Sequence, residues 1–260
     1  MRNIVEVRGV KIGAGIPKIC IPIVGKTKEE IFASANRAKE AFCDVAEWRA
    51  DWFDEVFDFA EVEMVLQKLR VILAEIPLLV TFRTKNEGGE KAISPEDYII
   101  FNQNVIKTGY ADLVDAEIFF ADDVLKKIVS KAHSVGVKVI ASNHDFSKTP
   151  QKEELVRRLK DMEERGADIA KIAVMPEYKK DLLTLLAATE CAAEEMQIPV
   201  VTMSMGEIGL LSRLSGEIFG SALTFGTAGA ASAPGQMDAV ELRKILTLIH
   251  KNSEKEQING

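Results

Sequence analysis

Lys171 is the residue whose type and surroundings point most directly to chemistry. It lies inside the apolar run Ile169-Ala170-Lys171-Ile172-Ala173-Val174, which is typical of a buried strand. A lysine in such a run either pairs with a carboxylate or serves chemistry, because an unpaired buried charge is costly. A desolvated amine near other cations loses its proton readily and can then attack a carbonyl carbon. Lys171 is thus a candidate nucleophile, and the alternative is an ion pair with Glu117 or Glu47.

His144 is a second candidate, because it occupies the polar end of another predicted strand in Ser142-Asn143-His144-Asp145. An imidazole in such a place can move protons near neutral pH. The alternative is an Asx-type turn that contains a histidine by chance. The other two histidines, His133 and His250, lie on amphipathic helical stretches and are expected at the surface.

Further charged side chains follow the same pattern at neighbouring strand ends. Glu47 and Arg49 end one predicted strand, Arg83 ends the next, and Glu87 lies in the loop after it. These groups could bind a polar substrate or form an internal salt-bridge network, and their spacing leaves both interpretations open. No cluster of His, Cys and carboxylate residues has the spacing of metal ligands, so we predict no metal.

The composition is that of a globular protein with a sizeable core. The chain has 260 residues, 47% of them hydrophobic, and a net charge of -7, which argues against a nucleic-acid surface. The three cysteines are scattered, as expected for reduced thiols. The sequence shows neither an N-terminal apolar leader nor an apolar run of about 18 residues. We therefore expect a cytoplasmic protein that binds neither membranes nor nucleic acids.

Short β-branched runs alternate with longer amphipathic stretches, and this alternation indicates βα units. The predicted strands are 19–25, 44–50, 78–83, 112–117, 138–143, 168–174, 199–204 and 222–227. The predicted helices are 28–42, 57–76, 95–109, 122–135, 151–165, 178–197, 207–219 and 237–251. Eight such units favour an α/β fold of the (β/α)8 TIM-barrel type. An open doubly wound sheet is the alternative, but the turn after the first strand lacks its glycine fingerprint.

We predict that residues 1–260 form a single domain, with the segments outside the βα units at its two ends. The first sixteen residues contain Gly9, Gly13 and Gly15, and we interpret them as a β-hairpin closing the barrel floor. The polar tail after His250 is expected to fray. In a barrel of this type, active-site residues project from the carboxyl ends of the strands. The charged strand ends should therefore converge on one rim, with Met203 and Met205 as an apolar wall beside Lys171.

The chain resembles the type I 3-dehydroquinate dehydratase family. The similarity runs through nearly all eight predicted strands, and the ordered set of motifs is much more specific than any one of them. The motifs are Glu47-Trp48-Arg49-Ala50-Asp51, Thr81-Phe82-Arg83-Thr84-Lys85-Asn86-Glu87-Gly88-Gly89, Ser142-Asn143-His144-Asp145-Phe146, Lys171-Ile172-Ala173, Met203-Ser204-Met205-Gly206, Gly216-Glu217-Ile218-Phe219-Gly220-Ser221 and Ala233-Pro234-Gly235-Gln236. One departure is Pro22, where some relatives carry a serine.

The resemblance implies dehydration of 3-dehydroquinate to 3-dehydroshikimate in the shikimate pathway, without metal or organic cofactor. It implies that Lys171 forms an imine with the C3 ketone, that His144 transfers the protons and that Glu87 orients His144. Arg213 would hold the substrate carboxylate, and a homodimer would be usual. Glu47, Arg49 and Arg83 would hold the ring hydroxyls. The small-residue loop 226–236 could be a plain flexible connection, as its composition alone favours, but its place at the rim favours a loop that closes over the ligand. Ser232 and Gln236 are then expected to hydrogen-bond the ligand.

The sequence leaves two alternative functions open. A class I aldolase also uses a barrel lysine imine but breaks a carbon–carbon bond. A non-catalytic sugar-acid binding protein would bind the ligand without adduct or turnover. The joint presence of Lys171, His144 and Glu87 favours the dehydratase over both.

Overall fold

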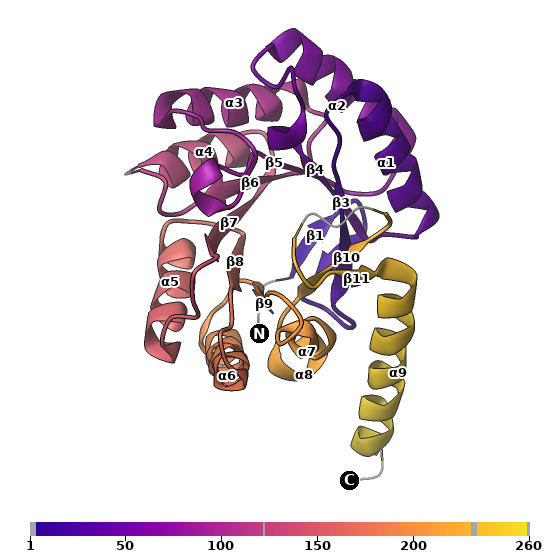
Figure 1. Ribbon diagram of the computed structural model, residues 1–260, viewed down its shortest axis with the longest axis vertical. Coiled ribbons are helices and arrows are strands. Elements are labelled where there is room, and N and C mark those ends of the chain that lie inside the picture. Colours follow the sequence, from indigo (N-terminus) through magenta and orange to yellow (C-terminus); the bar gives the residue numbers. More distant parts are fainter. Residues whose placement is uncertain (1–3, 122, 230–232, 259–260) are drawn as a thin grey trace.

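A curled parallel sheet surrounded by helices forms the body of the molecule (Figure 1). The computed structural model describes residues 4–121, 123–229 and 233–258, the last five of these by their backbone alone. Within this part of the chain, the strands of the main sheet follow the order β11-β10-β3-β4-β5-β6-β7-β8-β9. The two ends of this series meet, because Val200 of β9 forms a parallel bridge with Ser221, just before β10. The predicted α/β barrel is therefore confirmed.

Every predicted strand is present, with boundaries shifted by one or two residues. The barrel strands are β3 (Lys18–Ile23), β4 (Val45–Arg49), β5 (Leu78–Thr81), β6 (Leu113–Glu117), β7 (Lys138–Asp145), β8 (Ile169–Val174), β9 (Val200–Ser204) and β10 (Leu223–Thr227). Strand β7 is longer than predicted and continues to Asp145, so His144 lies within the strand and not in a turn. The Asx-type turn does exist, but Asp145 forms it by accepting hydrogen bonds from Ser147 and Lys148.

Helices cover the outside of the barrel (Figure 1). They are α1 (Lys28–Glu40), α2 (Phe59–Leu73), α3 (Pro95–Thr108), α4 (Val124–His133), α5 (Lys152–Glu164), α6 (Lys179–Glu195), α7 (Leu210–Leu214), α8 (Gly216–Phe219) and α9 (Ala239–Ile258), with short 3-10 turns η1 (Ala50–Trp52) and η2 (Lys85–Glu87). Local signals start and stop them. Thr27 and Glu30 form a capping box at the start of α1, and Ser94 caps α3, which ends at Gly109 in the left-handed conformation.

The alternation of side chains along the strands produces two separate apolar cores. One set of strand residues, such as Ile21, Trp48 and Ile172, packs outward against the helices. The other set, such as Val45 and Ile169, fills the barrel interior. Lys171 belongs by its position to the inward set, two residues after Ile169. The period of two thus decides that the polar residues further along each strand face the interior as well.

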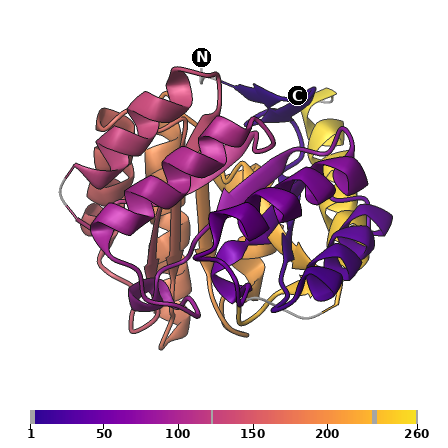
Figure 2. The same ribbon diagram turned by 90° about the horizontal axis from the view of Figure 1, so that it is seen from above.

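The first sixteen residues form the predicted hairpin, with β1 (Val5–Val7) antiparallel to β2 (Val10–Ile12). Arg8 and Gly9 both have positive φ, as the tightest hairpin turns require. Val5, Val7 and Ile12 pack into the same interior cluster as the first inward residues of the barrel strands. The hairpin therefore plugs the end of the barrel where the strands begin, and Figure 2 shows it, in dark indigo, at one end of the molecule.

Two helical predictions are wrong in detail. The stretch 207–219 is not one helix but the short helices α7 and α8, separated at Ser215. Serine hydroxyls interrupt the helical pattern, since Ser212 donates to the carbonyl of Gly209 and Ser215 to that of Leu211. Gly216 also lies so close to the carbonyl of Ser221 that a Cβ atom would approach it to 2.7 Å.

The last helix also differs from the prediction at both ends. Met237 and Asp238 form the short strand β11, which pairs with β10, and Asp238 then accepts hydrogen bonds from the amides of Val240 and Glu241. This cap places the start of α9 at Ala239. The backbone of the polar tail does not fray after His250, since α9 continues to Ile258.

We predict that the hairpin contributes substantially to stability. Ile12→Ala should lower the free energy of unfolding by about 2 to 5 kcal/mol, because Ile12 is fully buried in the barrel interior. Urea denaturation followed by circular dichroism measures this change. Lys11→Ala, one residue away and exposed, is the matched control and should have little effect. Equal stabilities of the two variants would show that the hairpin is not part of the core.

Candidate active site

A pocket opens at the carboxyl ends of the barrel strands, on the rim that the sequence predicts. Its lining comprises Glu47, Arg49, Arg83, Glu87, Gly88, His144, Phe146, Lys171, Ala173, Met203, Met205, Arg213, Phe225, Ala233 and Gln236. The structure thus brings together all of the predicted site residues that it describes. Ser232 lies outside the described residues.

Lys171 lies at the base of this pocket with only 4% of its side chain exposed. Its Nζ is 4.5 Å from the centre of the Phe225 ring, an arrangement in which the aromatic face attracts a cation. Met203 and Met205 line the pocket with it, as predicted. The carboxylate near Nζ is Asp115, whose Oδ2 is 3.8 Å away. The expectation of Glu117 or Glu47 as its alternative partner is therefore wrong.

Asp115 is fully buried on β6 and has two distinct oxygens. Oδ1 accepts hydrogen bonds from the Ser142 hydroxyl at 2.6 Å and from Arg83 at 2.9 Å. Oδ2 has no hydrogen-bond partner among the described residues and faces Lys171. Burial pushes the pKa of Asp115 upward, but Arg83 and Lys171 outweigh it and hold that pKa below its ordinary value. Asp115 is therefore an anion with one oxygen available to a cation at Lys171.

His144 and Glu87 form the second functional pair. The Nδ1 atom of His144 is 2.9 Å from Oε2 of Glu87, which also accepts a hydrogen bond from the His144 backbone amide. Asn143 donates from its amide nitrogen to Oε1 of Glu87 at 3.0 Å. When Nδ1 carries the proton that Glu87 accepts, the lone pair on Nε2 is available to a substrate. This tautomer can act as a general base.

The two groups are both held near their neutral forms. Burial, together with the cations of Arg83, Lys171 and Arg49, lowers the pKa of His144 well below its ordinary value. Burial raises the pKa of Glu87 to about 8, with the Glu117 carboxylate adding to the rise and Arg83 opposing it. Around neutral pH the pair is therefore close to a balance between two states. In one state Glu87 is protonated, and in the other Glu87 is ionised and accepts a hydrogen bond from Nδ1 of His144.

Arg83 and Arg49 are each held by carboxylates at the carboxyl ends of the strands. Arg83 contacts Asp115 at 2.9 Å, Glu117 at 2.8 Å and Glu87 at 3.6 Å, and these carboxylates raise its pKa against the effect of burial. Arg49 makes a two-pronged contact with Asp51, with both distances 2.8 Å. An internal salt-bridge network therefore exists, but its carboxylates are mainly Asp51, Asp115 and Glu117, and Glu47 accepts instead from the Thr81 hydroxyl at 2.8 Å. Glu47, Arg49 and Arg83 all line the pocket, so this network does not exclude substrate binding.

Arg213 on α7 is the pocket cation without a carboxylate. Only 1% of the residue is exposed, and burial alone lowers its pKa to about 10. It donates to the carbonyl of Pro234 at 3.1 Å and approaches the sulfur of Met203 at 3.7 Å. Its Nε has no partner among the described residues, and no salt bridge to it occurs there. A buried guanidinium of this kind is suited to bind an anionic ligand group.

The loop after β5 can present Glu87 only because of its glycines. Gly88 has φ of 83° and lies against the ring of Phe146, where a Cβ would come within 2.4 Å of the ring. A Cβ on Gly89 would lie 1.9 Å from the carbonyl oxygen of Arg83. The chain can therefore fold back tightly enough to direct Glu87 toward β7.

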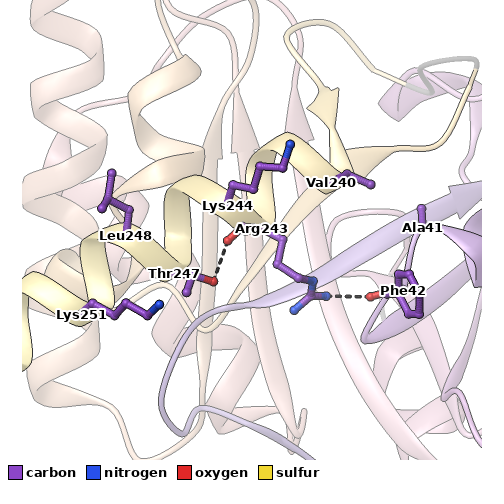
Figure 3. A pocket seen from close by; sticks show the side chains of 8 residues that line it. All are labelled: Ala41, Phe42, Val240, Arg243, Lys244, Thr247, Leu248 and Lys251. Carbon is purple, nitrogen blue, oxygen red and sulfur yellow. Dashed lines mark hydrogen bonds between the residues drawn. The ribbon is translucent and has the colours of Figure 1, made fainter.

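Another hollow lies on the outside of the barrel, between the end of α1 and helix α9 (Figure 3). Its lining combines apolar side chains with cations, and Arg243 there donates to the carbonyl of Phe42 at 2.7 Å. Neither a carboxylate nor a histidine lines it, so it offers no group suited to proton transfer at neutral pH. Among the described residues no group of His, Cys, Asp and Glu could hold a metal ion, and none of the helices there is long and apolar enough to cross a bilayer.

Comparison with known proteins identifies the family. The sequence model of type I 3-dehydroquinases matches residues 19–253, from the first barrel strand into the last helix. The chain belongs to this family.

Individual 3-dehydroquinate dehydratases are similar to this chain over almost their whole length. A 3-dehydroquinate dehydratase of Clostridioides difficile is 51% identical over 253 residues, which cover 97% of this chain and 99% of that protein. The crystal structure of a Clostridium difficile type I enzyme with covalently modified comenic acid has a TM-score of 0.94 at 50% identity and covers 97% of this chain and 100% of its own. The Geobacillus kaustophilus enzyme gives the same TM-score at 36% identity, with 96% and 97% covered.

Several residues of this type I 3-dehydroquinase site were not found from the sequence. The sequence motifs include Asp51 and Asn143 without giving either a role, and Asp115 lies outside these motifs. Strand parity would have selected Asp115, because it is two residues after the inward Leu113. His250 was expected at the surface, but only 26% of its side chain is exposed and it contacts Glu217 at 2.5 Å. His133 is exposed as expected and contacts Asp168.

Asp51 should be needed for the stability of the site. Its carboxylate is fully buried and accepts hydrogen bonds from Arg49 and from the backbone amides of Arg83 and Glu90. Asp51→Ala should lower the free energy of unfolding by about 3 to 5 kcal/mol, because Arg49 would remain buried without its partner. Denaturant unfolding provides the measurement. The control Asp54→Ala, at a side chain that is 66% exposed, should change stability by less than about 0.5 kcal/mol.

Proposed function

We propose that this 3-dehydroquinate dehydratase works through an imine on Lys171 and proton transfer by His144. The observation that carries the proposal is the closeness, around one pocket, of a buried lysine, a histidine–carboxylate pair and a buried arginine that has no carboxylate partner among the described residues. Dehydration of 3-dehydroquinate is the activity of the family, and each of these groups has a counterpart in what that reaction requires. The product is 3-dehydroshikimate.

Binding begins with the negative charge of the substrate. Its carboxylate would pair with Arg213, which carries no other carboxylate in the described part of the chain. Glu47, Arg49 and Arg83 would hold the ring hydroxyls, since they line the pocket on the side of β4 and β5. The loop 226–236 would cover the bound substrate, with Ser232 and Gln236 as its hydrogen-bonding residues. Exclusion of water by such a loop favours imine chemistry.

The imine forms by attack of Nζ of Lys171 on the C3 carbonyl carbon, followed by loss of the carbonyl oxygen as water. The protonated imine nitrogen carries a positive charge in an apolar pocket. Oδ2 of Asp115 is 3.8 Å from Nζ and has no hydrogen bond of its own among the described residues. Asp115 therefore serves as the counter-ion of the protonated imine.

Elimination follows from the acidity that the imine gives to C2. Nε2 of His144 removes the C2 proton, and the electron pair moves toward the imine nitrogen to give an enamine. When the electrons return, the C1–oxygen bond breaks and the departing hydroxyl takes the proton from His144. Water then hydrolyses the imine, which releases 3-dehydroshikimate and restores the amine of Lys171. Glu87 in its ionised form accepts a hydrogen bond from the Nδ1–H group and so orients the imidazole.

The proposal also includes the domain organisation, oligomeric state, partners and cellular compartment of the enzyme. Residues 1–260 would act as one catalytic domain, without metal or organic cofactor and without nucleic-acid or membrane partners. We propose a homodimer in the cytoplasm, with three reduced thiols. All three cysteines are free, which is compatible with a reducing compartment.

The experiment that tests this function combines activity with chemical trapping. The protein should convert 3-dehydroquinate to a product with enone absorbance, which a class I aldolase would not form. Borohydride added during turnover should attach a ligand-sized mass to the peptide that contains Lys171, as read by mass spectrometry. Lys171→Ala should show neither turnover nor adduct.

His144→Ala separates the two chemical steps in the same assay. It should still form the reducible adduct, since carbonyl attack does not need the imidazole, but its turnover should fall roughly 10²- to 10⁴-fold. An adduct on another lysine, or normal turnover without His144, would contradict the proposed roles.

A separate pair of variants tests Asp115. Asp115→Asn should reduce the trapped adduct at equilibrium by about tenfold, because the protonated imine loses its counter-ion. Glu117→Gln is the matched control: Glu117 also lies on β6 and holds Arg83, but its oxygens bond Thr84 and not Lys171. This control should raise KM and leave the trapped fraction at the wild-type level. Similar trapping in both variants would limit Asp115 to a role in holding Arg83.

A further inference from the structure

Arg158, on the outer helix α5, is connected to the proposed general base through a chain of hydrogen bonds. Its Nη1 donates to Oδ1 of Asn143 at 2.9 Å, and the Asn143 amide nitrogen donates to Oε1 of Glu87 at 3.0 Å. Oε2 of Glu87 in turn contacts Nδ1 of His144 at 2.9 Å. The chain therefore runs from the helix layer, through β7, into the pocket.

The chemistry of arginine gives this connection a direction. A guanidinium has donors and no acceptor, so the atom of Asn143 that faces it must be the amide oxygen. The amide nitrogen is then forced to face Glu87, where it can only donate. Glu87 is consequently an acceptor at Oε1, and any proton that Glu87 binds is directed to Oε2, beside His144.

Arg158 is itself held firmly in place. Its Nε donates to Glu154 at 2.7 Å, one turn earlier on α5, and its guanidinium lies 5.3 Å from the centre of the Phe119 ring. Only 17% of its side chain is exposed. The neighbouring Arg157 pairs with the same Glu154 through its Nε and Nη2 atoms, yet 60% of its side chain is exposed.

We propose that Arg158 is a positioning residue that fixes the orientation of the Asn143 amide and thereby keeps Glu87 as the acceptor for His144. This inference rests on the proposed function of the Glu87–His144 pair. If Arg158 is removed, the amide can rotate and present its oxygen to Glu87, which favours a protonated carboxyl. A protonated Glu87 can donate to Nδ1, and the imidazole then carries its proton on Nε2, where the base is needed.

The electrostatic surroundings of Glu87 set the sign of the effect. The groups that face Glu87 from the neighbouring elements are Arg83 after β5, Asp115 and Glu117 on β6, and Asn143 and His144 on β7. Burial and the two carboxylates raise the pKa of Glu87, whereas Arg83 and the Asn143 amide lower it. Loss of the amide donor should therefore raise that pKa further. The base-competent ionised form would then appear only at higher pH.

The test compares the pH dependence of kcat in Arg158→Met with that in the matched control Arg157→Met. Methionine keeps an apolar stem on Phe119 but removes every donor. Arg158→Met should lower kcat at neutral pH by about tenfold, the usual effect of losing one hydrogen bond to a charged group. Its rise in activity should move to higher pH by about one unit, with KM nearly unchanged. Arg157→Met, which also loses an ion pair to Glu154, should keep the wild-type profile.

Two further measurements keep the result interpretable. Arg158→Lys retains the charge and the stem, so it should fold normally and show a smaller shift in the same direction. Borohydride trapping should be as efficient in both Arg158 variants as in the wild type, because imine formation does not use Glu87. Wild-type pH profiles in both variants, or a loss of activity through KM alone, would overturn the inference. Absence of turnover or adduct in the wild type would instead refute the proposed function.

Discussion

The site depends on one constraint, which is that every buried charge in the barrel mouth must be compensated within a small volume. Arg83 is the centre of this compensation, because its guanidinium contacts Asp115, Glu117 and Glu87 together. Three carboxylates converging without a cation would repel one another and take up protons. With Arg83 in place, Asp115 stays ionised, whereas Glu87 remains close to the point of protonation. One arginine thus allows two neighbouring carboxylates to have different chemistry.

The barrel makes this constraint possible to satisfy. Strand parity directs alternate residues of each strand inward, and the lower inward positions are apolar while the upper ones are polar. The apolar set, together with the hairpin, forms a dry base below Lys171. That base raises the cost of any unpaired charge above it, so the polar layer is tightly specified. Arg213 is the exception within residues 4–121, 123–229 and 233–258, where no carboxylate pairs with it, and in the proposed mechanism the substrate carboxylate would take that place.

The sequence predicted the fold and most of the site because both follow local, periodic rules. All eight barrel strands could be located from β-branched runs, and the strand-end rule selected Lys171, His144 and Arg83. The pairings between strands were not predictable in the same way, since they depend on register. Asp115 and Glu117 are two residues apart and both face inward, and the register puts Glu117 level with Lys171 through Ser142. The carboxylate near Lys171 is nevertheless that of Asp115, because Arg83 and Thr84 hold Glu117. The contact between Arg158 and Asn143 likewise joins an outer helix to a strand that no local pattern relates.

The helical errors have equally physical origins. The stretch 207–219 has helical composition, but its serines bond their own backbone and Gly216 must approach Ser221. The last helix begins at Ala239 and not at Met237, because Met237 and Asp238 pair with β10 and Asp238 then caps α9. Hydropathy does not reveal this strand pairing. These are tertiary contacts overriding local preference.

The hairpin at the barrel floor also determines where ligands can enter and leave the barrel. Because Val5, Val7 and Ile12 fill the end where the strands begin, substrate and product share the opposite rim as entrance and exit. In the proposed mechanism, the water released at imine formation and the water consumed at hydrolysis would pass through the same rim. Departure of one ligand must then precede arrival of the next, so accumulated product competes directly with substrate for a dead-end chamber. Such an enzyme responds to the ratio of the two metabolites and not to substrate alone.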